Sequence, residues 1–204
     1  MFYKIVRAIV FVILNILFRI KVHYKDNTRI NEGEPLVLCA NHSSWFDPFV
    51  VAITFKDEIS YIAKKELFEN SFLKFLLTKI KVFPVDREGN SLSALKNSLR
   101  ILKDNNTLGI FPEGTRVKGF SESSVKGGIG MLVIRSKATV LPVYIDSKYR
   151  LFGRIDIYYG EKYDYNHLDK STLDSKQYTD ISIDIMKRIY NLKSSFKDDN
   201  HGNH

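Results

Sequence analysis

Residues 41–48, NHSSWFDP, place His42 and Asp47 five positions apart. A histidine that accepts a proton becomes an imidazolium, and a nearby carboxylate fixes its tautomer and stabilises its charge. Residues at this spacing can meet where a loop turns into a helix, and Asp followed by Pro is a good helix start. The segment therefore predicts a general base, His42, oriented by Asp47. The alternatives are a structural histidine and an aspartate that only caps the helix.

Two other kinds of site fit this segment poorly. Ser43 and Ser44 do not lie in a G-x-S-x-G turn, so we expect them to shape the loop or to bind substrate rather than to act as nucleophiles. The remaining histidines do not make a zinc-ligand spacing with His42, so no metal site is predicted. They are His23, His167, His201 and His204.

A second polar segment, FPEGTR at residues 111–116, combines a carboxylate, a glycine, a hydroxyl and a guanidinium. Arg116, like Arg87 in the segment DREGN, can clamp a phosphate bidentately. Gly114 lets the backbone approach a ligand closely, and Glu113 can orient a hydroxyl or an arginine. The pattern G-x-x-x-x-G-K-[ST] is absent, so this is not a nucleotide-binding P-loop. Each charge taken singly could equally be an ordinary surface residue.

The elements that must position these loops alternate between strand-like and helix-like patterns. This alternation is typical of an α/β fold, and we expect a single domain with a central, mostly parallel mixed sheet covered by helices. The polar loops follow predicted strands, and ligands collect at the carboxyl ends of strands in such folds. The strands are expected at 35–40, 58–64, 82–86, 107–111, 138–145 and 154–160, and the helices at 47–56, 66–80, 90–104, 127–137 and 177–193.

The N-terminal 25 residues are basic and apolar, and the first carboxylate is Asp26. The apolar run at 8–18 is shorter than the roughly 20 residues that a transmembrane helix needs. No small-residue cleavage site follows it, as a signal peptide would require. We therefore predict one amphipathic, membrane-associating interfacial helix over residues 1–22 of an N-terminal segment 1–25. A helix that simply packs on the domain at 26–196 is the alternative. The basic and polar side is expected to carry Lys4, Arg7, Asn15, Arg19 and Lys21, and residues 197–204 are expected to be a frayed polar tail.

The composition is that of a globular protein with 44% hydrophobic residues and a formal net charge of +8. This charge favours an acidic partner such as nucleic acid, anionic lipid or a phosphorylated substrate. Cys39 is the only cysteine, so no disulfide within the chain is possible.

These segments together resemble the conserved blocks of the glycerolipid acyltransferases, in particular the 1-acylglycerol-3-phosphate (lysophosphatidate) acyltransferases. The first block resembles NHSSWFDP, the second AKKELF (63–68) followed by VFPVDR (82–87), and the third FPEGTR continued by VKGG (125–128). The fourth resembles VLPVYI at 140–145. The resemblance runs from about residue 20 to residue 146, with the four blocks in order.

The resemblance implies transfer of a fatty acyl group from acyl-CoA or acyl-carrier protein to the sn-2 hydroxyl of 1-acylglycerol-3-phosphate. The product would be phosphatidic acid, an intermediate of phospholipid biosynthesis. The implied partners are a membrane lipid acceptor and an anionic membrane surface, with no nucleic acid and no bound cofactor. The implied location is peripheral or monotopic on the cytoplasmic face of the membrane. The catalytic pair is His42 and Asp47, and the substrate-binding residues are Lys64, Arg87, Glu113, Gly114, Thr115 and Arg116.

One position departs from the family pattern, because Lys81 stands where a glycine is usual. A lysine there could add a phosphate contact or obstruct one, which leaves the identity of the acceptor open. Another lysolipid or an amine-bearing acceptor would keep His42 and Asp47 without needing both arginines. A non-enzymatic protein that binds membrane or nucleic acid would explain the charge but not the four blocks.

Overall fold

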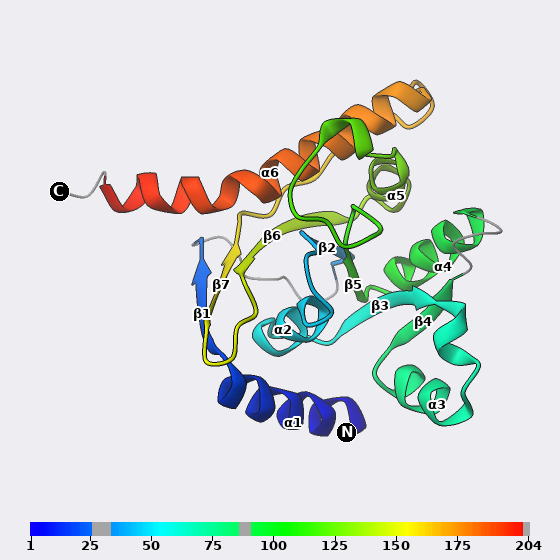
Figure 1. Ribbon diagram of the computed structural model, residues 1–204. Helices are drawn as coiled ribbons and strands as arrows, with labels where there is room; N and C mark the ends of the chain where they lie inside the picture. The colour runs from blue at the N-terminus through cyan, green and yellow to red at the C-terminus, as the bar shows by residue number, and fades with distance from the viewer. Residues whose placement is uncertain (26–33, 86–90, 202–204) are drawn as a thin grey trace.

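The computed structural model describes residues 1–25, 34–85 and 91–201 of the 204-residue chain. Within these residues seven strands form one sheet in the order β1-β7-β6-β2-β5-β3-β4 (Figure 1). All neighbouring strands are parallel except β6 and β7, which confirms the predicted mostly parallel mixed sheet. The strands are β1 (Arg19–Tyr24), β2 (Leu36–Ala40), β3 (Ile59–Lys64), β4 (Val82–Val85), β5 (Thr107–Ile110), β6 (Thr139–Ser147) and β7 (Arg154–Tyr159).

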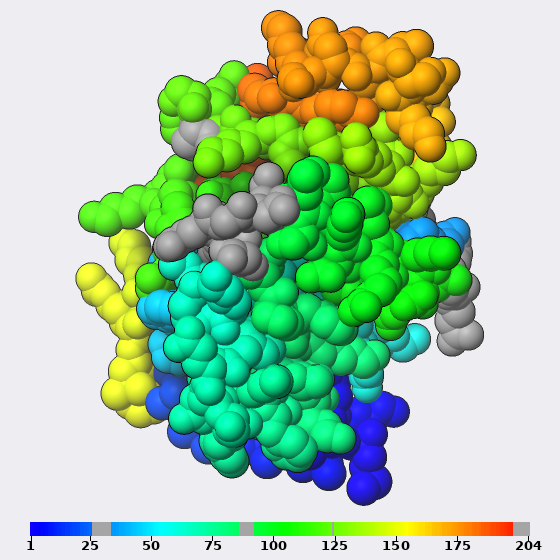
Figure 2. All heavy atoms as spheres, turned by 90° about the vertical axis from the view of Figure 1, so that its right-hand side faces the viewer, coloured from blue at the N-terminus to red at the C-terminus, as the bar shows by residue number. Residues whose placement is uncertain are grey.

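Helices cover both faces of the sheet, and each face has its own hydrophobic core. Helices α1 (Phe2–Leu17) and α2 (Asp47–Thr54) pack on one face. Helices α4 (Ser91–Lys103), α5 (Gly128–Ser136) and α6 (Ser175–His201) pack on the other. The short helix η1 (Lys65–Phe68) and helix α3 (Ser71–Lys79) lie beside the edge strand β4, on the side that Figure 2 shows. A further short helix, η2, spans Glu122–Ser124.

The predicted helix at 66–80 is divided in two, because Asn70 caps the start of α3. Its side-chain oxygen accepts a hydrogen bond from the backbone N–H of Leu73 at 3.0 Å. Asparagine is among the best N-capping residues, since it satisfies an N–H group that has no partner inside the helix. The apolar periodicity alone did not reveal this break.

The central strand β2 fixes the loop that follows it. All five of its residues are buried, and it has a parallel partner on each side, β5 and β6. Such a strand is hydrophobic on both faces because helices cover both of them. Asn41 then clamps the chain to β6: its side chain donates to the carbonyl of Ile145 at 3.0 Å and accepts from the N–H of Ile145 at 2.7 Å. The backbone at His42 therefore directly follows a residue that is anchored to the sheet by two hydrogen bonds.

The carboxyl ends of the parallel strands β2, β3, β4, β5 and β6 meet at one edge of the sheet. The loops at 41–46 and 111–117 leave from this edge, as predicted. The start of β1 lies at the same edge, because β1 and β7 run antiparallel to β6. The third predicted loop, 86–90 with Arg87, lies outside the described residues.

The N-terminal segment differs from the single helix predicted over residues 1–22. Helix α1 ends at Leu17, and residues 19–24 form β1, which pairs in register with β7. Phe18 has an extended backbone, with φ −138° and ψ 156°, and its side chain is buried in the core. Arg19 and Lys21 therefore belong to a strand and not to the helix. The segment RIKVHY alternates with a period of two, and pairing with β7 satisfies its backbone groups.

Of the predicted basic and polar side of the N-terminal helix, Lys4 and Asn15 are exposed on α1, whereas Arg7 departs from the prediction. Arg7 turns towards the domain, where its guanidinium donates to the backbone carbonyls of Ile53, Phe55 and Lys56 near the end of α2. These carbonyls lie at the last turn of a helix, which leaves four C=O groups without partners in the helix. The exposed surface of α1 is instead largely apolar, and it includes Phe2, Ile5, Ile9, Phe11, Val12, Ile13 and Ile16.

No helix in the described part of the chain has both the length and the apolar character needed to cross a membrane. At the other end, α6 extends to His201, so much of the predicted polar tail is helical.

Candidate active site

The loop between β2 and α2 brings His42 and Asp47 together as predicted. His42 Nδ1 lies 2.9 Å from Asp47 Oδ2, and the Asp47 side chain is fully buried. The same oxygen accepts hydrogen bonds from the backbone N–H groups of Ser43 at 2.6 Å and Ser44 at 2.7 Å. Asp47 is the first residue of α2 and makes no side-chain cap of that helix. Its carboxylate is therefore committed to the loop and to His42.

The contact with Asp47 decides which nitrogen of His42 can meet a substrate. A carboxylate only accepts hydrogen bonds, so Nδ1 carries the proton and Nε2 keeps a lone pair. The imidazole ring stacks on Phe111, with ring centroids 4.3 Å apart and planes inclined by 27°. This contact holds the ring in place while the side chain stays 18% exposed. The pair thus has the arrangement of a general base and the group that orients it.

Asp47 has a further partner that the sequence did not reveal. The hydroxyl of Tyr149 donates a short hydrogen bond to Asp47 Oδ1 across 102 residues of chain. Tyr149 lies in the loop after β6, and β6 is a parallel neighbour of β2. A loop that follows a strand parallel to β2 must reach the same edge of the sheet as His42. The sequence did not show that β6 is such a strand, so Tyr149 could not be predicted as a partner of Asp47.

The segment FPEGTR lies against the His42 loop. Gly114 has a φ of 67°, which favours glycine, and its N–H donates to the carbonyl of Phe111 at 3.0 Å to close a turn. The N–H of Val117 donates to the carbonyl of His42 at 2.8 Å. The guanidinium of Arg116 stacks over the exposed ring of Trp45, 4.1 Å from its centroid. Backbone and side-chain contacts thus join the two loops, and the role of Trp45 was missed in the sequence.

Glu113 is a half-buried carboxylate in this segment. One oxygen accepts a hydrogen bond from the hydroxyl of Tyr190, on α6, at 2.9 Å. The other oxygen, Oε2, is buried and has no hydrogen-bond partner among the described residues. Burial raises the pKa of Glu113, and this outweighs the opposing effects of the Tyr190 hydrogen bond and of nearby backbone amides. A buried carboxylate oxygen without a partner is uncommon in folded proteins, and this one lies beside the His42 loop.

The other predicted substrate-binding residues are distributed as follows. Lys64 ends β3 and lies exposed at the pocket described below, and Thr115 is exposed on the same turn as Gly114. Arg87 lies outside the described residues. Lys81 has a φ of 60°, a backbone region that favours glycine, and its ammonium pairs with Glu58 at 2.8 Å, at the start of β4 and away from the loops. Lys81 thus lies at the opposite edge of the sheet from the loops at 41–46 and 111–117.

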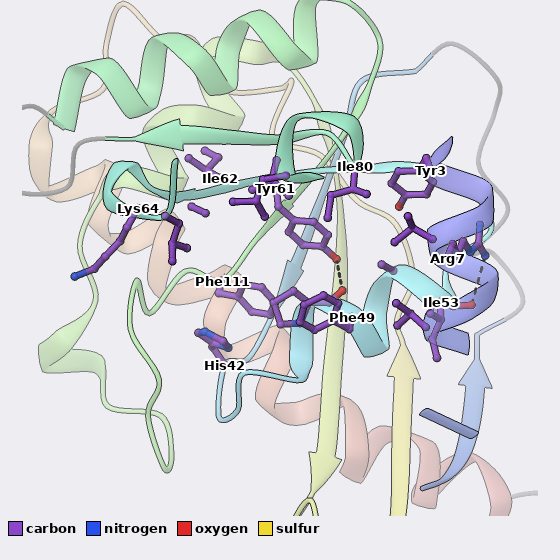
Figure 3. Close-up of a pocket in the computed structure, with 18 of the residues that line it drawn as sticks. Tyr3, Arg7, His42, Phe49, Ile53, Tyr61, Ile62, Lys64, Ile80 and Phe111 are labelled. Atoms are coloured by element: carbon purple, nitrogen blue, oxygen red, sulfur yellow. Dashed lines mark hydrogen bonds between the residues drawn. The ribbon is translucent and has the colours of Figure 1, made fainter. Parts of the chain in front are cut away.

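An apolar pocket of about 260 Å³ opens beside His42. Its walls come from α1, α2, β3, the end of α3 and the start of β4. His42, Phe111 and Lys64 lie at one side of the pocket, and Tyr3 and Arg7 lie at the other (Figure 3). Apart from these groups the lining is aliphatic and aromatic, and it includes Val6, Val10, Phe49, Ile53, Ile62, Leu77 and Ile80. Among the described residues, no cluster of three or more His, Cys, Asp and Glu is placed to hold a metal ion.

Comparison with known proteins agrees with this geometry. The model of the acyltransferase family matches residues 19–146, which contain both loops and the strands that carry them. The chain belongs to the acyltransferase family. It is 35% identical over 141 residues to the 1-acyl-sn-glycerol-3-phosphate acyltransferase of Bacillus subtilis (strain 168), covering 69% of each chain. It is 32% identical over 178 residues to the enzyme of the same name from Streptococcus pneumoniae, covering 83% of this chain and 66% of the relative. The matched region thus spans about two thirds of each relative.

A solved structure shares the fold of this acyltransferase. The crystal structure of the 1-acyl-sn-glycerophosphate acyltransferase from Thermotoga maritima superposes with a TM-score of 0.67. The match covers 94% of this chain and 79% of that one, at 21% sequence identity. Because the match covers 94% of this chain, the shared fold continues beyond residue 146, where the family model ends, and includes residues of α6.

Proposed function

We propose that this protein transfers a fatty acyl group from a thioester to the sn-2 hydroxyl of 1-acylglycerol-3-phosphate, giving phosphatidic acid for phospholipid biosynthesis. The observation that carries the proposal is the His42–Asp47 pair at the opening of an apolar pocket. The activity named for the relatives from Bacillus subtilis and Streptococcus pneumoniae supports it.

The reaction needs one base and a place for two substrates. His42 Nε2 takes the proton of the acceptor hydroxyl while the hydroxyl oxygen attacks the carbonyl carbon of the thioester. Asp47 stabilises the imidazolium that forms, and the C–S bond then breaks as the new C–O bond is completed. The departing thiolate takes the proton from His42, so the products are an ester and a free thiol. General-base assistance of this kind contributes about 10²–10⁴-fold, and positioning of the two substrates contributes much of the rest.

The acceptor phosphate would bind at the loops beside His42. Arg116 and Arg87 supply guanidinium groups for bidentate contacts, and Lys64 adds an ammonium at the pocket mouth. The open turn at Gly114 and Thr115 lets the backbone approach the phosphate. Glu113, in the same segment, would orient an arginine or a hydroxyl of the glycerol. Such a set of contacts selects a phosphorylated glycerolipid over an uncharged one.

The apolar pocket suits an acyl chain, because its walls offer almost no hydrogen-bonding groups between His42 and the far side. An acyl chain lying there places its carbonyl carbon near His42. The donor is acyl-CoA or acyl-carrier protein, and each is consumed as a substrate, so no resident cofactor is needed.

The reaction also requires access to a lipid surface, and we propose a peripheral or monotopic association on the cytoplasmic face of the membrane. The exposed apolar side chains of α1 support this, and Leu151 and Phe152 extend them from the β6–β7 loop. Phe2 of α1 also contacts Phe75 of α3, with ring centroids 6.2 Å apart. An apolar surface of this kind can enter the boundary between head groups and acyl chains.

We expect apolar residues to contribute more to membrane association than basic ones. A fully inserted isoleucine contributes about 1.5–3 kcal/mol, whereas a lysine near an anionic surface contributes about 1 kcal/mol. The double change Ile9→Ser and Ile16→Ser should therefore weaken vesicle co-sedimentation more than Lys4→Gln, which lies on the same helix. A larger effect of Lys4→Gln, confined to anionic vesicles, would show that charge dominates.

The proposed activity is tested by release of free thiol from acyl-CoA or acyl-carrier protein. The acceptors are 1-acylglycerol-3-phosphate, neutral lysophospholipids and an amine-bearing acceptor, each in mixed micelles. We expect turnover with 1-acylglycerol-3-phosphate to exceed that with the others, and phosphatidic acid to be formed. Preference for an acceptor without a terminal phosphate would reassign the substrate, and vesicle binding without thiol release from any acceptor would support a non-enzymatic role.

A further inference from the structure

The buried carboxylate of Asp47 is held from both sides, and the two sides come from distant parts of the chain. Its Oδ2 accepts from His42 and from the N–H groups of Ser43 and Ser44. Its Oδ1 accepts from the hydroxyl of Tyr149. We infer that Tyr149 is a positioning residue for acyl transfer, whose hydroxyl locks the orientation of Asp47 and so the aim of His42. This inference rests on the proposed function.

Asp47 Oδ1 depends on this hydrogen bond. The Asp47 side chain has no exposed surface, and Tyr149 is the side-chain donor that reaches Oδ1 among the described residues. Without the hydroxyl, a charged and buried oxygen would lose its partner, which is far costlier than losing an exposed hydrogen bond. The carboxylate would then turn about its terminal bond to find another donor. Any such turn misaligns Oδ2 with His42 Nδ1, because both oxygens belong to one rigid group.

Tyr149 is itself held in an uncommon conformation. Its φ is 44°, a region that residues other than glycine adopt only when their surroundings impose it. Its N–H donates to Ser147 Oγ at 2.9 Å. Its ring stacks on Phe46 at 5.5 Å and meets Phe18 edge-to-face at 5.7 Å. The hydroxyl is thereby fixed in direction before a substrate binds.

The end of α1 supports the same loop. The N–H of Phe152 donates to the carbonyl of Leu17 at 2.7 Å, and the N–H of Arg19 donates to the carbonyl of Gly153 at 2.8 Å. Burial and the charge of Asp47 raise the pKa of Tyr149 far above its ordinary value, so the hydroxyl keeps its proton and stays a donor. Tyr149 also lies just beyond residues 19–146, the part that the family model matches. The β6–β7 loop is thus held against the end of α1 while it presents the Tyr149 hydroxyl to Asp47.

The direct test is Tyr149→Phe, which keeps the ring and its two aromatic contacts but removes the hydroxyl. Because the variant loses a hydrogen bond to a charged group, we expect kcat to fall by roughly 10- to 100-fold. The KM values of donor and acceptor should stay near those of the wild type, because Tyr149 is not among the residues that line the pocket. The downfield NMR resonance of the His42 Nδ1 proton should broaden in the variant, which reports the misalignment independently of turnover.

A double-mutant cycle separates positioning from a general effect on the fold. Asp47→Asn removes the group through which Tyr149 acts, so adding Tyr149→Phe to Asp47→Asn should lower kcat little further. The matched control is Tyr165→Phe, because Tyr165 also donates to a carboxylate, Asp184 Oδ2, at 2.6 Å, on the opposite face of the sheet. Its kcat should equal that of the wild type. Ser147→Ala, which loosens the loop and leaves the hydroxyl in place, should lower kcat by less than Tyr149→Phe.

Three results would overturn the inference while leaving acyl transfer intact. The first is a Tyr149→Phe variant with wild-type kcat and an unchanged Nδ1 resonance. The second is a loss that multiplies fully with that of Asp47→Asn. The third is an equal loss in Tyr165→Phe. Melting temperatures are measured for every variant, and assays are run below the lowest transition. A wild-type protein that releases no thiol would instead contradict the proposed function.

Discussion

Within the described residues a histidine pairs with an aspartate twice, and the two pairs have similar distances. His42 Nδ1 lies 2.9 Å from Asp47 Oδ2, and His23 Nε2 lies 2.7 Å from Asp156 Oδ1. The first pair lies in a loop at the carboxyl end of β2, beside the pocket. The second joins the neighbouring strands β1 and β7. Distance alone therefore does not distinguish a catalytic pair from a structural one.

Charge balance separates the two pairs. Asp156 is shared with Arg154, whose Nε lies 2.5 Å from Oδ2, so its negative charge is already compensated. His23 is stacked on Tyr158, with ring centroids 4.5 Å apart. In the described chain, the partners of Asp47 besides His42 are neutral donors, which leave its charge to stabilise an imidazolium. A base needs an uncompensated carboxylate and room for a substrate, and only the pair at the pocket combines them.

The sharpest way to break this comparison is to remove each histidine. His42→Ala should lower kcat by about 10²–10⁴-fold, because the general base is lost. His23→Ala should leave kcat near the wild-type value, since His23 lies on β1 away from the pocket. Thiol release measures both, and circular dichroism checks that both variants fold. Equal losses of turnover would mean that the His42 effect is structural.

Removing the charge of each aspartate should also separate the pairs. Asp47→Asn should lower kcat by at least about 10²-fold, because the amide no longer stabilises the imidazolium and can favour the wrong tautomer. Asp156→Asn should keep kcat, since its charge serves Arg154 and His23. The comparison uses kcat at saturating donor and acceptor. A variant Asp47→Asn with near-normal kcat would show that the carboxylate charge is not used.

The arginines near the two pairs should differ in substrate binding. Arg116→Ala should raise the KM of the phosphorylated acceptor by roughly 10- to 100-fold, because a charge-assisted contact to phosphate is lost. Arg154→Ala should not change it, because Arg154 is engaged by Asp156. Acceptor KM is measured at fixed donor, and donor KM at fixed acceptor. If Arg116→Ala raises the KM of the donor equally, Arg116 serves the thioester substrate.

The smallest expected effects concern the dependence of stability on pH, and they have opposite signs. Burial alone would raise the pKa of Asp156, but hydrogen bonds from Arg154 and His23 outweigh it and lower the pKa below its usual 3.8. Asp156 therefore stabilises the fold above about that pH and loses the effect as the pH falls through its folded pKa. Burial raises the pKa of Glu113 above its usual 4.5. The protonated side chain therefore stabilises the folded state below that pH, and this stabilisation is lost as the pH rises through the folded pKa.

Urea unfolding across pH measures both effects. Asp156→Asn should be less stable than the wild type at neutral pH, and the difference should shrink in acid. Glu113→Gln should gain stability relative to the wild type as the pH rises through the raised pKa of Glu113. A difference that stays constant with pH in either variant would contradict the assigned cause.

Local patterns in the sequence determined much of the fold and the centre of the site. Apolar periodicity located nearly all strands and helices within a few residues, and their alternation determined the mostly parallel sheet. The spacing of His42 and Asp47 predicted their contact, because residues five positions apart can meet where a loop turns into a helix. Gly114 was predicted only to let the backbone approach a ligand closely, and its positive φ was found in the structure. These features depend on neighbours in sequence.

The tertiary structure decided the contacts between distant segments. Tyr149 reaches Asp47 over 102 residues, Tyr190 reaches Glu113 over 77, and Arg7 reaches the carbonyl of Phe55 over 48. Each of these contacts depends on which strands are neighbours in the sheet. The strand order β1-β7-β6-β2-β5-β3-β4 cannot be derived from the periodicity of apolar residues in the sequence. The same reason hid β1, whose period-two pattern acquires meaning only beside β7. Residue types and spacing identify the proposed base, His42, whereas long-range packing supplies the contacts that hold its partner Asp47.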